Sequence, residues 1–300
     1  MATVAEPQSA ALPLPGGSQG AAVRLHPLLT ATMRGPEAWF LRQEGRLAKL
    51  RAFGIGTPKD QWLTVPVPAF WVEHPTAGHV LVDTGLHPSA AVDPKQTLGR
   101  IGSLAFKDVE MTADQALPAQ MRAQGVDPAQ VSVVLMTHLH IDHASAMSEF
   151  PQATFLFSTR EWEAATDDGQ LHGYRRQQFD HAFDYRTLDF DAPGSDSFAS
   201  FARSYDVFGD GSVVCVYTPG HTHGHMSVVL RLAGREALIA GDAIYTLRTL
   251  THSHLPARME DTHHFRRSLR EIQLYAEQTP GALIIPGHDM EYWKKLDPLY

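Results

Sequence analysis

The segment from Thr137 to His143 constrains this chain more than any other stretch. Three histidines and one aspartate stand there in the order His-x-His-x-Asp-His. Imidazole nitrogens and carboxylate oxygens are the ligands that hold zinc and similar divalent ions in proteins. Apolar residues 131–136 precede the segment and small residues follow it, which predicts a strand, a turn and then a helix. The ligands would then stand at the C-terminal end of a strand, where open α/β sheets place their sites; the alternative is a histidine-rich surface turn.

Further segments pair an apolar run with a polar residue that follows it. Residues 69–74 and 79–82 are two such runs around a Pro-Thr-Ala-Gly turn, a pattern typical of a hairpin, and Asp83 follows the second run. Three later runs lead to one potential ligand each: residues 212–217 to His221, 236–240 to Asp242 and 282–285 to His288. A glycine directly precedes each of these three ligands, and glycine permits a tight turn.

The potential ligands are too many for one tetrahedral zinc ion. They are His138, His140, Asp142, His143, His221, Asp242 and His288. The set suits two metal ions that share a bridging carboxylate. Two divalent ions carry more positive charge than two carboxylates can neutralise. The net positive charge of the site lowers the pKa of a bound water and so favours a bridging hydroxide. The sequence therefore predicts a hydrolytic site with two divalent metal ions, for which zinc is expected and iron, manganese and cobalt are alternatives.

Composition limits the classes of protein that this chain can belong to. Hydrophobic residues make up 43% of the 300, enough for a substantial core, yet no apolar run is long enough to cross a bilayer. A net charge of −8 argues against a nucleic-acid partner, which needs a basic face. The single cysteine, Cys215, excludes an intrachain disulfide framework and fits a reducing compartment. We therefore expect a cytoplasmic protein that acts on a small molecule and binds neither membrane nor nucleic acid.

The N-terminal residues differ in composition from the rest. Residues 1–20 are rich in alanine, proline, glycine and serine and lack the basic start of a secretory signal. We expect a flexible arm there and a single hydrolase domain over residues 21–300. Such an arm can wrap a neighbouring subunit, which is compatible with a homodimer.

The ligand motifs resemble those of the metallo-β-lactamase superfamily. The resemblance rests on His-x-His-x-Asp-His, Thr-Pro-Gly-His, Gly-Asp and Pro-Gly-His-Asp in this order, and it covers residues 66–289. It implies an α/β protein, an αββα sandwich of two mixed β-sheets flanked by helices, with the metals at one edge of the sheets. It also implies a role for each ligand: His138, His140 and His221 for one metal, Asp142, His143 and His288 for the second, and Asp242 as the bridge. Asp83 looks like the aspartate of this family that orients a ligand histidine.

Tyr245 narrows the resemblance to one branch. It stands three residues after Asp242, a spacing similar to that of N-acyl-homoserine lactonases, in which this tyrosine points at the substrate carbonyl. The resemblance implies that a metal-bridging hydroxide opens the lactone ring of an acyl lactone, the reaction known as quorum quenching. Tyr245 would donate a hydrogen bond to the developing oxyanion, and Asp142 would pass a proton to the leaving oxygen. The alternative is that Tyr245 only packs beneath the metal loop.

Other functions stay open at this point. Glyoxalase II-like thioesterases share the ligand motif, and organophosphate triesterases and other lactonases share the fold. A catalytically silent metal-binding scaffold is the alternative that is not an enzyme, and one bound ion per chain instead of two would favour it. Cys215 is expected on a strand, so a cysteine nucleophile is disfavoured.

Residues 159–201 lie between two metal motifs and are rich in aromatic side chains. These are Trp162, Tyr174, Phe179, Phe183, Tyr185 and Phe190. Such residues can line an apolar groove for an acyl chain, or they can close a small core or a subunit interface. Two further expectations concern the C-terminal half: His225 makes a hydrogen bond behind the ligands or in the core, and residues 262–278 form a helix.

Overall fold

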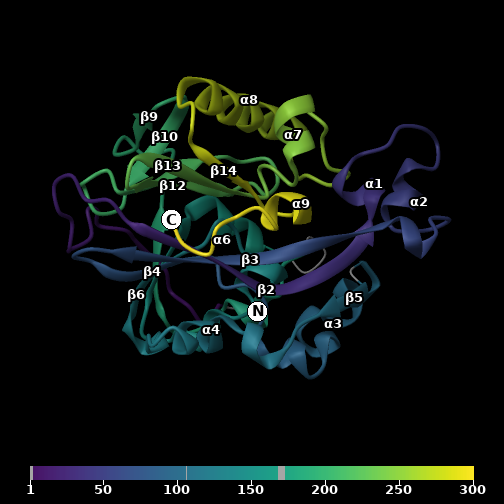
Figure 1. Cartoon of the computed structure of the whole chain (residues 1–300), viewed down its shortest axis with the longest axis horizontal. Coiled ribbons are helices and arrows are strands. Elements are labelled where there is room, and N and C mark those ends of the chain that lie inside the picture. Colours follow the sequence, from purple (N-terminus) through teal and green to yellow (C-terminus); the bar gives the residue numbers. More distant parts are fainter. Residues whose placement is uncertain (1–2, 106, 168–172) are drawn as a thin grey trace.

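A computed structural model describes residues 3–105, 107–167 and 173–300. Two β-sheets pack face to face, and helices cover the outer face of each sheet (Figure 1). The larger sheet has the strand order β1-β8-β7-β6-β4-β3-β2-β5 and the smaller one the order β14-β13-β12-β11-β10-β9. Both sheets contain parallel and antiparallel pairs. The expected αββα sandwich of two mixed sheets is therefore confirmed.

The bounds of the elements are as follows. The larger sheet consists of β1 (Gln8–Ser9), β2 (Arg24–Pro36), β3 (Trp62–His74), β4 (Gly78–Val82), β5 (Lys107–Glu110), β6 (Val131–Leu135), β7 (Thr154–Ser158) and β8 (Asp184–Leu188). The smaller sheet consists of β9 (Asp196–Phe198), β10 (Phe201–Asp206), β11 (Val213–Tyr217), β12 (Met226–Leu232), β13 (Arg235–Gly241) and β14 (Leu283–Pro286). The helices are α1 (Glu37–Phe40), α2 (Ala48–Ala52), α3 (Pro94–Ala105), α4 (Leu117–Ala123), α5 (Ile141–Ala144), α6 (Thr159–Thr166), α7 (Leu247–His252), α8 (Thr262–Gln278) and α9 (Met290–Trp293).

The strands expected from the sequence are present. Strands β3 and β4 pair antiparallel and form the expected hairpin. The strands expected at residues 212–217, 236–240 and 282–285 are β11, β13 and β14, with ends within one residue of the prediction. Strand β6 is followed by a turn and by α5, which is the strand, turn and helix predicted around the histidine motif.

Strand β11 illustrates how the sandwich buries its apolar side chains. Val213, Cys215 and Tyr217 belong to the core between the two sheets. Val214 and Val216 belong to the core beneath α8. Because successive side chains of a strand point to opposite faces, a strand that is covered on both sides is apolar throughout. Cys215 is fully buried on this strand, as expected.

Helix α8 covers the outer face of the smaller sheet, at the top of Figure 1. It begins after Asp261, whose Oδ1 accepts a hydrogen bond of 2.9 Å from the backbone N–H of His264 and so caps the helix. Leu269, Ile272 and Tyr275 are buried on the side that faces the sheet. The helix expected at residues 262–278 is confirmed with the same ends.

The N-terminal segment corrects the expectation of a flexible arm. Strand β1 pairs in parallel with β8, and the backbone N–H of Ala5 donates a 2.8 Å hydrogen bond to Asp180 Oδ1. Leu14 is buried in the core between the sheets, and its backbone N–H donates to the carbonyl of Val207. Composition alone suggested a free segment, but backbone pairing and a few buried side chains attach residues 3–20 to the body of the protein.

The aromatic residues of the 159–201 segment lie mostly in the core. Tyr174, Phe179 and Tyr185 are buried in the cluster on the outer face of the larger sheet, and Trp162 and Phe183 pack against this cluster. Phe190 belongs to the core between the sheets. The structure therefore favours the packing alternative over an acyl groove for these side chains. No helix in the described part of the chain combines the length and apolar character that crossing a membrane requires.

Candidate metal centre

The predicted ligands meet at one edge of the sandwich, where several strands end. The turn after β6 carries His138, His140, Asp142 and His143. The turns after β11, β13 and β14 carry His221, Asp242 and His288, respectively. Strand β6 runs parallel to β4, and β13 runs parallel to β14. The C-terminal ends of parallel strands lie at the same edge of a sheet, so the turns that follow them converge.

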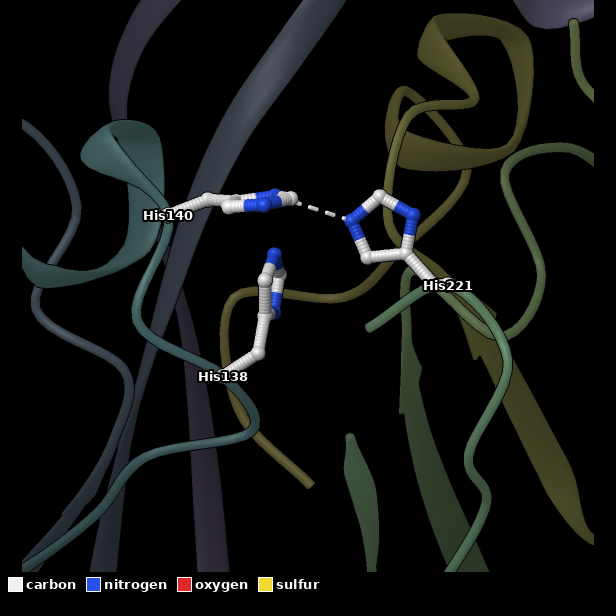
Figure 2. Close-up of side chains that lie close together, drawn as sticks. All are labelled: His138, His140 and His221. Carbon is white, nitrogen blue, oxygen red and sulfur yellow. Dashed lines mark hydrogen bonds between the residues drawn. The ribbon is translucent and has the colours of Figure 1, made fainter. Parts of the chain in front are cut away.

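The first group of ligands consists of His138, His140 and His221. One potential ligand atom from each lies within 4.8 Å of the others. His140 Nδ1 is 3.0 Å from His221 Nε2, and Figure 2 shows the ring of His138 pointing toward the space between these two rings. Three imidazoles that converge in this way form a face that can hold a metal ion.

The second group consists of Asp142, His143 and His288. Asp142 Oδ2 lies 3.8 Å from His143 Nε2 and 3.5 Å from His288 Nε2. Asp142 and His143 come from the short helix α5, whereas His288 comes from the turn after β14. This group also has the residue types and spacing of a metal site.

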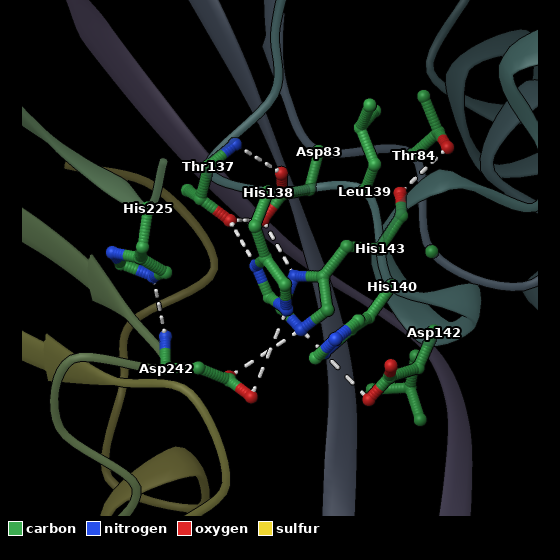
Figure 3. A network of polar contacts seen from close by, with 12 residues as sticks. Asp83, Thr84, Thr137, His138, Leu139, His140, Asp142, His143, His225 and Asp242 are labelled. Carbon is green, nitrogen blue, oxygen red and sulfur yellow. Dashed lines mark hydrogen bonds and ion pairs between the residues drawn. The ribbon is translucent and has the colours of Figure 1, made fainter. Parts of the chain in front are cut away.

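Asp242 lies between the two groups. Its Oδ2 is 3.2 Å from His221 Nε2 and 3.9 Å from His138 Nε2, on the side of the first group. Its Oδ1 is 3.4 Å from His143 Nε2 (Figure 3). The same oxygen is 3.3 Å from His288 Nε2, on the side of the second group. One carboxylate thus presents a different oxygen to each group, which is the arrangement that a bridge between two metals needs.

Contacts behind the histidines orient their rings. Asp83 Oδ2 accepts from His143 Nδ1 at 2.7 Å and from the hydroxyl of Thr137 at 2.8 Å (Figure 3). Because the Thr137 hydroxyl donates to Asp83, it accepts from Nδ1 of His138, 3.1 Å away. His288 Nδ1 donates to the backbone carbonyl of Pro66 at 3.1 Å. These bonds leave Nε2 of all three rings facing the cluster.

The charges of the cluster favour a cation. Burial lowers the pKa of His143, but the carboxylates of Asp83, Asp142 and Asp242 outweigh burial and hold this pKa well above its ordinary value. Burial raises the pKa of Asp242, but the surrounding imidazoles outweigh it and the pKa lies well below the ordinary value. At His221 burial dominates and lowers the pKa to about 4. The carboxylates therefore draw positive charge to the side of His143, where a divalent ion can take the place of a proton, while His221 on the other side stays a neutral ligand.

Several ligand atoms are close to other ligand atoms but make no hydrogen bond. Nε2 of His138 and of His143 and Oδ1 of Asp242 are buried, and within residues 3–105, 107–167 and 173–300 nothing forms a hydrogen bond to them. Buried polar atoms are nearly always paired in proteins, so such a set calls for an additional partner. Divalent metal ions fit these donors, and the two groups around Asp242 are compatible with a dinuclear site.

Tyr245 lies beside the first group and is buried, with 3% of its surface exposed. Its hydroxyl oxygen is 3.3 Å from His221 Nδ1, and its ring centre is 5.3 Å from that of His288. Burial, reinforced by the carboxylates of Asp242 and Asp142, raises the pKa of Tyr245 well above its ordinary value. The hydroxyl therefore keeps its proton and can donate it in a hydrogen bond.

Two residues behind the ligands complete the site. His225 Nε2 accepts from the backbone N–H of Asp242 at 3.0 Å, so the expected hydrogen bond of His225 is confirmed. Burial lowers the pKa of His225 to about 3, which keeps it neutral in this role. Glu161 of α6 was not identified from the sequence; it is fully buried and bonds to the backbone beside His138 and to the side chain beside His221. Only its position in a Ser-x-x-Glu helix start was visible in the sequence.

Known proteins are similar to this chain over most of its length. A family model described as the metallo-beta-lactamase superfamily matches residues 62–288. The N-acyl homoserine lactonase AttM of Azorhizobium caulinodans is 36% identical over 234 residues, which cover 76% of this chain and 84% of that protein. The AttM lactonase of Agrobacterium fabrum matches with the same identity and coverage.

A solved structure has a similar fold. It is that of B. thuringiensis AiiA with N-decanoyl-L-homoserine bound at the active site; the TM-score is 0.73 at 20% identity, covering 91% of this chain and 96% of that one. The family model spans most of the chain, and the relatives match over most of their own length. The chain belongs to the metallo-beta-lactamase superfamily.

Proposed function

We propose that this chain hydrolyses the lactone ring of N-acyl homoserine lactones. The observation that carries the reaction type is the position of Asp242, whose two oxygens face two separate histidine groups. A structural metal site would be closed by four ligands around one ion, whereas two groups that share a carboxylate suit hydrolytic chemistry. The substrate class rests on the similarity to the AttM lactonases over 84% of their length.

Each predicted ligand has a place in this proposal. One divalent ion would be held by His138, His140 and His221, and the other by Asp142, His143 and His288. Asp242 would bind both ions. We propose zinc, since neutral imidazole and carboxylate suit it. Two ions held here would polarise the lactone carbonyl and activate a water molecule as the nucleophile. Asp83 would keep the His143 ring in the orientation that the second group needs.

Tyr245 would stabilise the negative charge that develops on the carbonyl oxygen. With Nε2 of His221 acting as a ligand, its Nδ1 carries the proton and donates toward the Tyr245 hydroxyl, 3.3 Å away. The Tyr245 oxygen then serves as the acceptor in that contact, and its own O–H remains free to donate to the substrate. A preorganised donor of this kind is worth about 3 kcal/mol in the transition state.

Asp142 would accept the proton released by the attacking water and pass it to the leaving oxygen. Its side chain is 15% exposed, against 4% for Asp242, so it is the more accessible of the two carboxylates in the cluster. Asp142 Oδ2 faces His143 and His288, and Oδ1 would be the oxygen that meets the substrate. Opening the ring produces an alcohol and a carboxylate, and the alcohol oxygen needs one proton.

The test is hydrolysis by purified protein of known metal content. The panel consists of short- and long-chain N-acyl homoserine lactones, a simple γ-lactone, S-lactoylglutathione and an aryl phosphotriester. We expect about two divalent ions per chain and a kcat/KM for the acyl homoserine lactones that exceeds the others by orders of magnitude.

The panel also separates the alternatives. Preferred hydrolysis of the thioester or of the phosphotriester would keep the metals and reject the lactone as substrate. One ion per chain with no hydrolysis of any compound would favour the silent scaffold. The Asp242→Asn variant is the control for activity from contaminating hydrolases, because it should be inactive on every substrate.

A further inference from the structure

The carboxylate of Glu161 connects the two loops that carry the first ligand group. Its Oε1 accepts from the backbone N–H of Leu139 at 2.8 Å, and Leu139 stands between His138 and His140. Its Oε2 accepts from the hydroxyl of Thr222 at 2.6 Å, and Thr222 directly follows His221. One side chain therefore bonds, on both sides, to residues adjacent to all three histidines of this group.

The local sequence would give this carboxylate a different task. Ser158 caps α6 and accepts from the backbone N–H of Glu161 at 3.2 Å, as in a capping box. In such a box the glutamate turns back to the start of its own helix. Here the carboxylate turns away from its helix and bonds to the two ligand loops.

The packing around Glu161 holds its carboxylate against the two ligand loops. The side chain has no exposed surface. Gly224 lies so close to the backbone of Glu161 that a Cβ at this position would clash with it, so the loop after His221 can approach α6 only with glycine there. Burial raises the pKa of Glu161 to about 7, so a carboxylate is costly at this position. Its two hydrogen bonds to the ligand loops offset this cost, and an apolar residue could not make them.

We propose that Glu161 is a positioning residue for the group of His138, His140 and His221, and that it sets the spacing of their two loops. The inference rests on the proposed dinuclear site. The second group depends on other contacts: His143 bonds to Asp83 and His288 bonds to the Pro66 carbonyl. Loss of the Glu161 carboxylate should therefore weaken metal binding by the first group and leave the second group unchanged.

The test measures cobalt binding by the metal-free full-length protein in two backgrounds. His288→Ala removes a ligand of the second group, and His140→Ala removes one of the first. We expect Glu161→Leu to weaken cobalt binding about tenfold to a hundredfold in the His288→Ala background, the range for loss of a residue that supports a ligand. In the His140→Ala background we expect no change. Chelator competition gives the affinities, and the visible cobalt spectrum reports the geometry of the bound ion.

Further variants separate positioning from general stability. Glu161→Gln keeps the shape and one acceptor oxygen, so its affinity should lie between those of the parent and of Glu161→Leu. Glu163→Gln, on the same helix with 61% of its side chain exposed, is the matched control and should change nothing. Thermal unfolding of each metal-free protein shows whether Glu161→Leu is folded. This variant leaves the Leu139 N–H and the Thr222 hydroxyl without acceptors, so its melting temperature should fall, and Glu161→Gln, which keeps one acceptor oxygen, carries the comparison if Glu161→Leu does not fold.

The possible results distinguish this inference from the proposed function. An equal effect of Glu161→Leu in both backgrounds, or no effect in either, overturns the inference. If the unmodified protein binds no cobalt, the inference and the dinuclear proposal fail together. If it binds two ions and hydrolyses no lactone, only the proposed substrate is rejected, and the selective effect in the His288→Ala background still supports the role of Glu161.

Discussion

Two buried histidine–aspartate pairs in this protein have opposite surroundings. His143 Nδ1 bonds to Asp83 at 2.7 Å, while its Nε2 is buried without a hydrogen-bond partner in the described residues. His74 Nε2 bonds to Asp210 at 3.1 Å, while its Nδ1 accepts from the backbone N–H groups of Thr76 and Ala77. We call the first pair open, because one nitrogen of its histidine makes no hydrogen bond. We call the second pair closed, because both nitrogens of its histidine are bonded.

The two pairs lie at opposite ends of β4. His74 pairs with Gly78, the first residue of β4, whereas Asp83 directly follows Val82, its last residue. The extended strand between Gly78 and Asp83 spans roughly 17 Å. A histidine buried beside an aspartate is therefore not in itself a sign of function. What marks the metal edge is the set of open nitrogens directed at a shared carboxylate, and the following predictions test that distinction.

The largest effect is expected for Asp242→Asn. The amide removes the charge that both ligand groups share, so metal content should fall and kcat/KM for lactones should drop about a thousandfold or more. Metal analysis and hydrolysis assays of the purified variant measure both quantities. Retention of two ions and of activity would show that Asp242 does not bridge.

Tyr245→Phe should have the next largest effect. The change removes only the hydroxyl near His221, and kcat should fall about a hundredfold, the cost of losing one preorganised oxyanion donor. Metal content should stay at the level of the unmodified protein, because Tyr245 is not among the ligand groups. Unchanged turnover would reject the oxyanion role and favour packing beneath the metal loop.

Asp83→Asn tests the open pair directly. Asparagine keeps the size of the side chain but weakens the bonds to His143 and Thr137. Metal affinity should fall about tenfold to a hundredfold, measured by chelator competition, while the variant saturated with metal should regain most of its activity. An unchanged metal affinity would show that His143 needs no orienting carboxylate. The pair of His143 and Asp83 would then not differ in function from the pair of His74 and Asp210.

Much of the fold and of the candidate site could be predicted because the signals are local. The apolar runs predicted the strands that precede His221, Asp242 and His288, and turns after parallel strands meet at one edge. The contacts that the sequence did not reveal are non-local. Pro66 and His288 are 222 residues apart and meet through a backbone carbonyl, which leaves no trace in residue type.

For the N-terminal segment the amino-acid composition gave a wrong expectation, and tertiary contacts explain why. The N-terminal composition suggested a flexible arm, but Leu14 is buried in the core and β1 pairs with β8. The Ser-x-x-Glu motif that ends at Glu161 is typical of a helix start, and it does not reveal the partners of the Glu161 carboxylate. Zinc as the metal, a homodimer and a cytoplasmic location stay predictions.

The smallest effect on catalysis is expected for Asp210→Asn, the change that tests the closed pair. Burial raises the pKa of Asp210, but hydrogen bonds from Ser212, Ser18 and His74 outweigh it and lower the pKa to about 2. A carboxyl whose pKa is lower in the folded state stabilises the fold above the ordinary pKa near 4, and this contribution is lost as the pH falls toward 2.

At pH 7 the variant should therefore be about 2 kcal/mol less stable in urea unfolding. The difference between variant and parent should shrink as the pH is lowered from 4 toward 2. The folded variant should bind metal and hydrolyse lactones at the parental rate, since Asp210 lies at the far end of β4 from the ligands. Equal stability at pH 7, or a loss of metal, would mean that the two histidine–aspartate pairs do not divide into a structural and a functional one.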